Sequence, residues 1–460
     1  MGIGVSGWQL AGVVARLGQL GVVSGAGAHI VMSRVLQHGD EGSHYRRALA
    51  QFPDQGMAER VLASYFVAGG IDPATPFRGI RQFSVESCRE VIEFTMCANF
   101  AQVWLAKEGH GNGVGVNFLE KVQLPFLFAL YGALLAGVDY ILIGAGVPNQ
   151  VPAALQKLAR HESASYLLHI PGDGANAGKV FVTFDPADFF PPGRPQLKVP
   201  KFFPIVASAS LAQALMKSGD IDGFVIEGPT AGGHNAPPRG HSQLSSDGEP
   251  VYGPRDEVDF ERLYKLERPF WLAGGYASPA GLQKAISLGA QGIQVGSIFA
   301  LCEESRISKD LKQAIRRAGF RGEQRVFTDP RGSPTGFPFK VATLPGTLSE
   351  PDFYAARERV CDLRGLQELY RTADGSVGYR CPAEPVEQFV AKGGNPEATV
   401  GRKCLCNALL ANLGLGQWRA DGGVELPLVT LGDDLSFLRN LMTDESSAYT
   451  AEQALAYLLS

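Results

Sequence analysis

The chain lacks the features that mark secreted, membrane-spanning or disulfide-rich proteins. Its longest apolar stretch, residues 124–138, is too short to cross a bilayer and runs into Asp139, so a buried helix followed by a buried strand explains it better. Residues 1–21 show no charged segment followed by an apolar core and a small-residue cleavage site, so no signal peptide is expected. Seven widely spread cysteines among 460 residues argue against a disulfide scaffold and predict a reducing, cytoplasmic location.

The chain also lacks a strong excess of charge of one sign. Its formal net charge is −4 and no basic run is present, so neither nucleic acid nor an anionic membrane is expected as the main partner. The histidines show no metal-ligand spacing and no HExxH motif occurs, so no catalytic metal is expected. What remains is ordinary globular composition, 45% hydrophobic and 19% charged, in a chain long enough for one large and one smaller domain.

A unit of glycine, short apolar strand and glycine recurs along the chain. It occurs at residues 137–144 (GVDYILIG), 219–228 (GDIDGFVIEG) and 289–296 (GAQGIQVG). In each unit a glycine closes a helix, a run rich in β-branched residues forms a buried strand, and a second glycine opens the next loop. The preceding segments, residues 125–136, 211–218 and 279–288, are predicted to be helices.

Further strands fit between these units, at residues 114–117, 166–170, 203–207 and 270–273. Strands that alternate with helices of this length predict a parallel sheet, either open or closed. No Rossmann fingerprint is present over residues 20–300, and this favours a parallel (β/α)8 barrel of the TIM type over an open doubly wound sheet.

The strand pattern ends near residue 345. Residues 351–372 and 403–413 read as helices, so we expect a barrel over residues 1–344 and a mainly helical C-terminal region over 345–460. Residues 235–268, rich in Pro, Gly, Ser and charge, are too long for a simple strand–helix connection and predict a rim insertion with a helix.

Two glycine-bearing turns predict a phosphate site. Gly274-Gly275 and Gly296-Ser297 each follow a predicted strand and lie about twenty residues apart, which is one strand–helix repeat. The loops after the last two barrel strands commonly bind phosphate, because glycine lets backbone N–H groups approach the oxygens and a helix N-terminus favours negative charge. Glycines that serve only turn geometry are the alternative at either turn taken alone.

A third segment, residues 227–234 (EGPTAGGH), carries the candidate catalytic group. It follows a predicted strand at the end of the barrel where active sites lie. Gly232 and Gly233 let the backbone lie against a flat ligand, and His234 can then move a proton beside it. A loop histidine that only bonds backbone is the alternative reading of His234.

These residues resemble the nitronate monooxygenase (2-nitropropane dioxygenase-like) family of FMN-dependent barrels, which also includes enoyl reductases and NADH:quinone reductases. Residues 113–118 (GVGVNF) are similar to a family strand end whose Asn contacts the flavin, here Asn117. Residues 227–234 resemble QGxEAGGH, and residues 273–275 and 294–297 (QVGS) resemble the family's phosphate loops. Glu304-Ser305 is similar to a following ES pair.

The resemblance covers roughly residues 1–345 and implies FMN as cofactor. By resemblance, His234 is the catalytic base, and the cofactor-binding residues are Asn117, Glu227, Gly232, Gly233, Gly274, Gly275, Gln294, Gly296 and Ser297. The chain departs from the pattern in Glu227, where the family has Gln, and in Pro229-Thr230 and Ser297-Ile298. Relatives carry a further strand before the segment that begins here with Met1-Gly2, so a chain that starts at this point would lack or replace the first barrel strand.

The resemblance implies a flavin oxidoreductase that oxidises a carbon acid, with a small-molecule or acyl substrate. An NAD(P)H-dependent reductase of enoyl thioesters or quinones is the alternative, so O₂ and NAD(P)H are both candidate co-substrates. A flavin-binding subunit without its own turnover is a third reading, and a homo-oligomer is left open.

Four of the seven cysteines, Cys361, Cys381, Cys404 and Cys406, fall in the C-terminal region. A zinc or iron–sulfur site needs four soft ligands brought together, but no C-x₂-C pair is present, so buried reduced thiols are the simpler expectation. Residues 334–340 (PTGFPFK) form a stiff aromatic loop that either covers the flavin or packs between domains.

Overall fold

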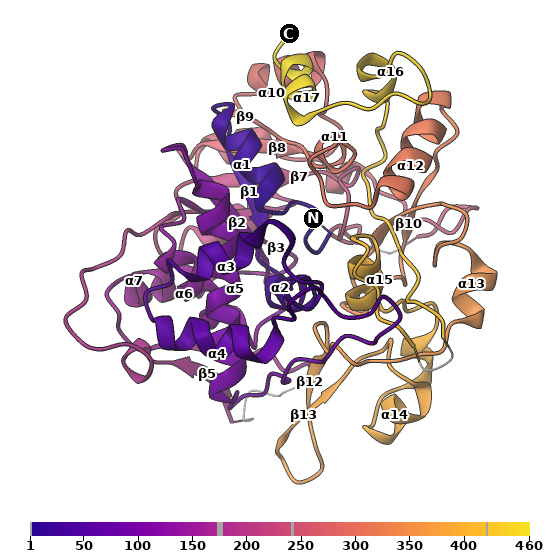
Figure 1. Ribbon diagram of the computed structural model, residues 1–460. Helices are drawn as coiled ribbons and strands as arrows, with labels where there is room; N and C mark the ends of the chain where they lie inside the picture. Colours follow the sequence, from indigo (N-terminus) through magenta and orange to yellow (C-terminus); the bar gives the residue numbers. More distant parts are fainter. Residues whose placement is uncertain (1, 173–177, 241–242, 420–421) are drawn as a thin grey trace.

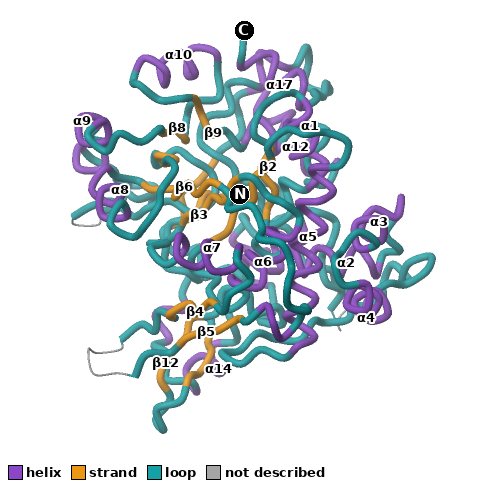
Figure 2. The backbone as a smooth tube through the Cα atoms, turned by 90° about the vertical axis from the view of Figure 1, so that its left-hand side faces the viewer, coloured by secondary structure: helices purple, strands orange, loops and turns teal. Residues whose placement is uncertain are grey.

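The structure is a computed structural model of the chain, and it describes residues 2–172, 178–240, 243–419 and 422–460 (Figure 1). A central sheet of parallel strands is surrounded by helices, as the view in Figure 2 shows. In the part of the chain so described, no helix combines the length and the apolar character needed to cross a membrane.

The central sheet is that of the predicted parallel α/β barrel. Its strands pair in the order in which they occur along the chain, without the reversal of a doubly wound sheet. They are β1 (Gly21–Ser24), β2 (Val114–Leu119), β3 (Tyr140–Gly144), β6 (Lys201–Val206), β7 (Phe224–Glu227), β8 (Phe270–Ala273) and β9 (Gly292–Gln294). Seven strands are therefore paired within the described residues where eight were expected, and β1 and β9 are the two ends of the row.

One predicted barrel strand lies outside this sheet. Residues 166–170 were expected to join it, but β4 (Ala164–Leu167) pairs antiparallel with β5 (Phe181–Phe184) while β3 pairs directly with β6. Buried and exposed residues alternate along β5, and Ser165 is exposed between buried Ala164 and Tyr166. This alternation is typical of an antiparallel strand with one solvated face, whereas barrel strands are continuously apolar.

The barrel helices follow the predicted segments closely. The apolar stretch forms α6 (Phe126–Leu135), which is buried almost all round and packs against α5 (Arg89–Lys107). The other helices of the barrel part are α1 (Trp8–Arg16), α2 (Ala28–Gln37), α3 (His44–Leu49), α4 (Gln55–Tyr65), α7 (Val151–Ala159), α8 (Ala209–Leu215), α9 (Phe260–Tyr264), α10 (Pro279–Ser287), α11 (Ser297–Ala300) and α12 (Lys309–Arg321). In the predicted rim insertion, the structure places α9 near its end.

The C-terminal part contains two antiparallel pairs as well as helices. These are β10 (Val326–Asp329) with β11 (Phe339–Ala342), and β12 (Glu368–Arg371) with β13 (Val377–Arg380). Its helices are α13 (Pro351–Ala356), α14 (Val386–Ala391), α15 (Leu405–Ala411), α16 (Leu438–Leu441) and α17 (Ala451–Leu458). The helix predicted over 351–372 is wrong beyond Ala356, because a tight turn with Gly375 at φ +83° joins β12 to β13 as a hairpin.

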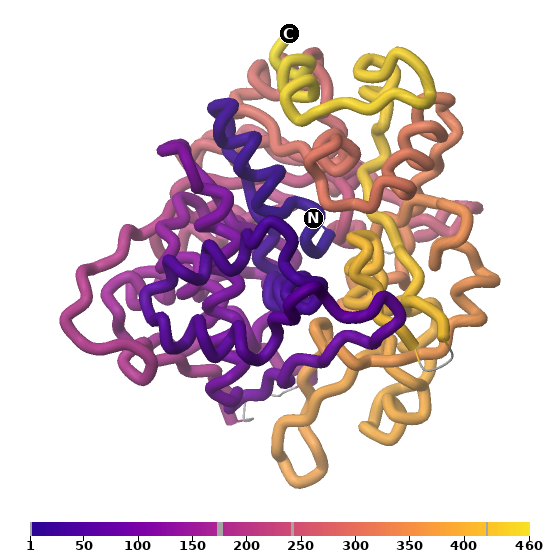
Figure 3. The backbone as a smooth tube through the Cα atoms, in the orientation of Figure 1, coloured from indigo at the N-terminus to yellow at the C-terminus, as the bar shows by residue number. Residues whose placement is uncertain are grey.

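The two ends of the chain share one hydrophobic cluster. Val5 and Leu10 pack in it with Ile298 and Leu301 of the α11 region and with C-terminal residues such as Val429 and Leu458. Helix α17 contacts α1, α10 and α11, and Figure 3 shows this yellow segment lying beside the indigo N-terminal helix. The C-terminal part therefore covers the side of the sheet where β1 and β9 lie.

Candidate functional site

A cavity of about 580 Å³ extends from the interior of the sheet to the turns after β7, β8 and β9. Its size lies within the range of about 300–1,000 Å³ that is usual for small-molecule and cofactor sites. Apolar side chains from successive strands line its inner part, including Leu142, Phe203, Val225 and Trp271. The predicted residues Asn117, Glu227, Gly232, Gly274, Gly275, Gln294, Gly296 and Ser297 all line the same cavity.

The turn after β8 needs glycine for its own packing. Gly274 has φ +90° and Gly275 has φ +73°, a region that favours glycine. A Cβ atom on Gly274 would lie 2.9 Å from Thr230 Oγ1 and 3.1 Å from Ala231 N. This turn is therefore packed tightly against the loop that follows β7.

Gly296, in the turn after β9, has no such internal reason to be glycine. Its φ of −120° is accessible to any residue, and no atom lies within 4 Å of the position that a Cβ would occupy. That position faces the cavity, where a side chain would take up space next to Ser297. Because Gly296 has no side chain, the cavity remains open at the predicted phosphate turn.

A C-terminal segment that the sequence analysis missed completes this end of the cavity. The Gly432 N–H donates to Ser297 Oγ at 2.8 Å, and the Gly233 N–H donates to Thr430 Oγ1 at 2.8 Å. A Cβ atom on Gly232 would lie 2.8 Å from Gly432 N, so the two chain segments are in close contact. Thr430, Leu431 and Gly432 line the cavity, and no local sequence signal connects them with residues far earlier in the chain.

Polar side chains also face the largely apolar cavity, and three of them, besides Ser297, belong to predicted site residues. Asn117 lies on β2, Glu227 ends β7 and Gln294 ends β9, and among the described residues none of the three side chains has a hydrogen-bond partner. Polar groups within a largely apolar cavity orient a bound ligand. Burial raises the pKa of Glu227 to about 7, so its carboxyl group is close to half protonated at neutral pH.

His234 and Gly233 do not line this cavity. The His234 Nε2 atom is 2.7 Å from Ser333 Oγ, and the ring packs edge-on against Phe339, with the ring centroids 4.9 Å apart. Burial lowers the pKa of His234 to about 3, so the imidazole is neutral at neutral pH. A neutral ring can accept a proton, and the contact with Ser333 fixes its orientation.

The aromatic loop of residues 334–340 packs against the histidine segment. The Asn235 N–H donates to Pro338 O at 2.9 Å, and the Lys340 N–H donates to Gly233 O at 2.9 Å, so the two segments form an isolated antiparallel bridge between His234 and Phe339. The Lys340 ammonium is buried and donates to Thr328 Oγ1 at 2.7 Å and to Asp433 Oδ2 at 2.6 Å. The loop thus fixes the backbone on both sides of His234.

The Glu304-Ser305 pair lies outside the cavity and supports the packing of α17. Glu304 Oε2 accepts a hydrogen bond of 2.8 Å from the Ala451 N–H, at the first residue of α17. Ser305 Oγ donates to Ala300 O at 2.6 Å and thereby closes the short helix α11. A carboxylate at a helix N-terminus is favoured by the helix dipole.

Comparison with known proteins connects the central part of this site with one enzyme family. Residues 198–332 match the family described as nitronate monooxygenase. A probable nitronate monooxygenase of Bacillus subtilis is 35% identical over 116 residues, which is 25% of this chain and 32% of the relative. Nitronate monooxygenase of Pseudomonas aeruginosa is 28% identical over 160 residues, 32% of this chain and 42% of the relative. The match spans about a third of the length of the first of these curated relatives.

Solved structures with a related arrangement include FabK from Thermotoga maritima, with a TM-score of 0.46 and 16% identity over 99% of this chain and 88% of that one. Nitroalkane oxidase from Streptomyces ansochromogenes has a TM-score of 0.45 and 15% identity over 100% of this chain and 92% of that one. The family match covers β6 to β9 and the turns at Gly274, Gly296 and Ser297. Residues 198–332, which supply part of the cavity wall, are thus similar to the nitronate monooxygenase family.

Proposed function

We propose that this relative of the nitronate monooxygenases is an FMN-dependent oxidoreductase that oxidises a carbon acid. The single observation that carries the proposal is the cavity in which both glycine turns, Asn117, Glu227 and Gln294 meet. The turns proposed to bind the phosphate line this cavity together with apolar walls and a few polar groups. Such a combination suits a molecule with an anionic tail and a flat ring system.

The residues present fit FMN. Gly275, Gly296 and Ser297 would hold the phosphate, and the open Cβ position at Gly296 leaves room for it. Asn117, Glu227 and Gln294 would face the ring system, since their side chains have no described protein partner in the cavity. When bound, the flavin supplies the electron-accepting chemistry, while the protein supplies binding, orientation and proton transfer.

His234 would act as the base. Its Nε2 atom is in contact with Ser333, whereas no described residue hydrogen-bonds Nδ1, so Nδ1 is the nitrogen that would take a proton from the substrate carbon. The ring is neutral at the pH at which the enzyme would work and so can take up a proton. Burial also makes it a weaker base than an exposed histidine, so the role requires the bound ligand to raise its pKa. Because Gly232 lines the cavity and His234 does not, this role needs the substrate to reach beyond the cavity wall.

The test is reconstitution with FMN followed by aerobic assay with alkyl nitronates. We expect stoichiometric yellow flavoprotein, and a His234→Gln variant that keeps FMN but loses about 10²–10⁴-fold in kcat. Ser333→Ala is the matched control, because it removes the ring's hydrogen bond and leaves the base in place, so its loss should be much smaller. Protein that takes up no FMN under native conditions would overturn the proposal, and full activity in His234→Gln would remove the base assignment.

A reductase of enoyl thioesters or quinones is the second candidate. The observation that favours it is the apolar inner wall of Leu142, Phe203, Val225 and Trp271, which suits an acyl chain or a quinone ring better than a small nitronate. Anaerobic mixing with NADH and with NADPH separates the two functions. Rapid bleaching of the flavin by either nucleotide would favour the reductase, and stable colour would favour O₂-dependent oxidation.

A further inference from the structure

Four cysteines from three separate chain segments surround one small void. Cys361 precedes β12, Cys381 follows β13, and Cys404 and Cys406 lie at the start of α15. All four line a void of about 10 Å³, which is room for about one water-sized sphere. The remaining cysteines, Cys88, Cys97 and Cys302, do not line it. The sequence favoured unconnected buried thiols, whereas the fold collects four of the seven at one place.

Each of the four sulfur atoms lies beside a backbone N–H group. The N–H groups belong to Arg364 at Cys361, Ala383 at Cys381, Asn407 at Cys404, and both Gly365 and Leu366 at Cys406. Three of these donors lie two or three residues after their cysteine in the chain. Thiols packed as small hydrophobic groups need no such donors, whereas metal-bound thiolates are stabilised by them.

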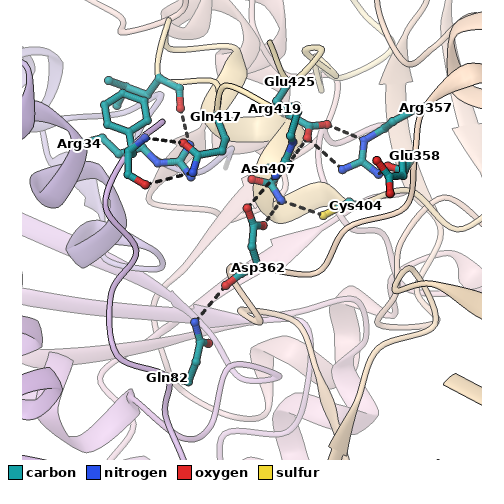
Figure 4. A network of polar contacts seen from close by, with 12 residues as sticks. Arg34, Gln82, Arg357, Glu358, Asp362, Cys404, Asn407, Gln417, Arg419 and Glu425 are labelled. Carbon is teal, nitrogen blue, oxygen red and sulfur yellow. Dashed lines mark hydrogen bonds and ion pairs between the residues drawn. The ribbon is translucent and has the colours of Figure 1, made fainter. Parts of the chain in front are cut away.

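Buried cationic groups lie close to the same sulfur atoms. Arg357 lies near Cys404 and Arg402 lies near Cys381, and both guanidinium groups are partly or largely buried. Asn407 Nδ2 is 3.5 Å from Cys404 Sγ and donates to Asp362 Oδ1 at 2.6 Å, as Figure 4 shows. These guanidinium groups and amide donors would offset part of the negative charge of a thiolate set, to which the carboxylates of Asp362 and Glu384 near Cys361 add.

The four sulfur atoms are not drawn together as they are around a bound ion. Among the described residues, no group of three or more His, Cys, Asp or Glu side chains has the spacing of a single-metal site. A void that accepts a water-sized sphere is also wider than the closed shell of zinc, whose Zn–S bonds are about 2.3 Å long. Binding of one ion would therefore require the four sulfur atoms to move inward, and an iron–sulfur cluster would require the void to widen.

We propose that Cys361, Cys381, Cys404 and Cys406 form a four-thiolate centre for a soft metal, either a zinc ion or an iron–sulfur cluster. With zinc, four thiols lose four protons and the four sulfur atoms bind one Zn²⁺, which leaves a net charge of −2 beside Arg357 and Arg402. With iron, the same thiolates bind a cluster of iron and inorganic sulfide delivered as a unit. Because each thiol must lose its proton to bind a metal, metal affinity falls as the pH is lowered.

The centre would also position the proposed base. Pro334 lines the void with the cysteines, and its neighbour Ser333 is the residue in contact with His234. Arg402, two residues before Cys404, donates to the carbonyl oxygen of Ser333. A metal held by Cys404 and Cys406 would thereby fix the Ser333 loop, so these cysteines act as positioning residues for His234.

The test is metal analysis of the full-length protein, purified without oxygen and without added metal. We expect about one zinc per chain, or iron together with acid-labile sulfide and visible absorption that persists after FMN is extracted. Cys406→Ser should lower the metal content below a fifth of the wild-type value. Cys302→Ser is the matched control, because Cys302 is equally buried but lies outside the cluster, and its metal content should stay unchanged.

A measurement on the wild type makes the test independent of how the variants fold. Protein treated with a strong chelator is titrated first with Zn²⁺ and then, in a separate sample, with iron and sulfide. Stoichiometric uptake that protects four thiols from alkylation supports the centre, and the metal taken up identifies its kind. Wild-type protein that holds and takes up neither metal, with all cysteine thiols reactive after unfolding or with Cys361 and Cys381 in a disulfide, overturns the proposal.

Discussion

Glu227 and His234 lie close together in the sequence, yet burial shifts their pKa values in opposite directions. The pKa of Glu227 is raised from 4.5 to about 7, so folding favours its protonated form, and this contribution to stability is lost as the pH rises from about 4.5 through 7. The pKa of His234 is lowered from 6.5 to about 3, so its contribution is complete above pH 6.5 and is lost as the pH falls towards 3. The site is therefore most stable with both side chains uncharged.

The first prediction concerns Glu227. A protonated carboxyl can donate a hydrogen bond to a ligand in the cavity, and an ionised one cannot, so FMN affinity should fall as the pH rises from 6 to 8. Glu227→Gln replaces the carboxyl with a permanent donor and should remove most of this pH dependence while retaining FMN. Flavin fluorescence titrations of both proteins at each pH measure the Kd for FMN. Ionisation of the FMN phosphate affects both proteins alike, so the difference between their pH curves reports on Glu227. Parallel pH curves for the two proteins would contradict the prediction.

The second prediction concerns Gly296. Because its Cβ position is open and its φ is ordinary, Gly296→Val should leave the melting temperature of flavin-free protein within a few degrees of the wild type. The added side chain takes space beside Ser297, so the Kd for FMN should rise at least tenfold. Gly111→Ala serves as control, since Gly111 also has an open Cβ position but does not line the cavity. An unchanged Kd in Gly296→Val would place the phosphate elsewhere.

At the scale of elements, the polar network in Figure 4 holds the C-terminal segments together. Glu425 accepts hydrogen bonds from Arg357 at 2.6 and 3.0 Å and also from Arg419, and its side chain is only 2% exposed. Arg419 in turn donates to Asp362 at 2.8 Å, next to Cys361. Neighbouring contacts reach the barrel, since Gln82 donates to Asp362 O at 3.0 Å and Arg34 of α2 donates to Leu415 O.

The third prediction is that this network has a large effect on stability. Glu425→Gln removes the carboxylate partner of the largely buried Arg357 and leaves Arg419 with Asp362 alone, which should cost about 3–5 kcal/mol. The matched control is Glu445→Gln, which breaks an ion pair with Arg321 in which both side chains are more than 40% exposed, and it should cost less than about 1 kcal/mol. Denaturant unfolding of the flavin-free proteins at pH 7 measures the loss in the free energy of unfolding for each variant. Equal midpoints for the two variants would show that the network contributes little.

The sequence predicted those elements whose cause is local. The glycine–strand–glycine units correctly indicated β3, β7 and β9, and the apolar stretch indicated α6. A strand buried on both faces, or a helix buried all round, consists almost entirely of apolar residues and can be recognised from its own sequence. Prediction failed at β4 and at residues 357–372, where the outcome depends on a pairing partner. Eight of the ten predicted site residues line one cavity, and their roles remain predictions. Thr430 and Gly432 were missed because only the tertiary fold brings them to Ser297.

At the scale of the whole molecule, the barrel and the C-terminal part share their packing. The cluster of Val5, Leu10 and Ile298 is closed by C-terminal residues, among them Leu438 and Tyr449. Tyr449 also donates to Ile298 O at 2.7 Å. The sequence predicts a domain boundary near residue 344. The packing between residues before and after this boundary determines whether either part can fold without the other.

The fourth prediction concerns this boundary. A chain shortened to residues 1–344 loses Thr430 and Gly432 from the site and exposes the apolar side chains of Ile298, Leu301 and Ile315. We expect it to aggregate or to fail to bind FMN, as judged by size-exclusion chromatography and by absorption of the flavin. Soluble, monodisperse truncated protein with wild-type flavin content would instead show that the barrel folds and binds by itself.

The hydrogen bond from Gly432 to Ser297 has a consequence for folding during synthesis on the ribosome. The two residues are 135 positions apart in the chain. At a synthesis rate of about 5–20 residues per second, the turn after β9 emerges on the order of ten seconds before the segment that covers it. During that interval the pocket of the nascent chain is incomplete, so the proposed FMN would bind only after Gly432 has left the ribosome.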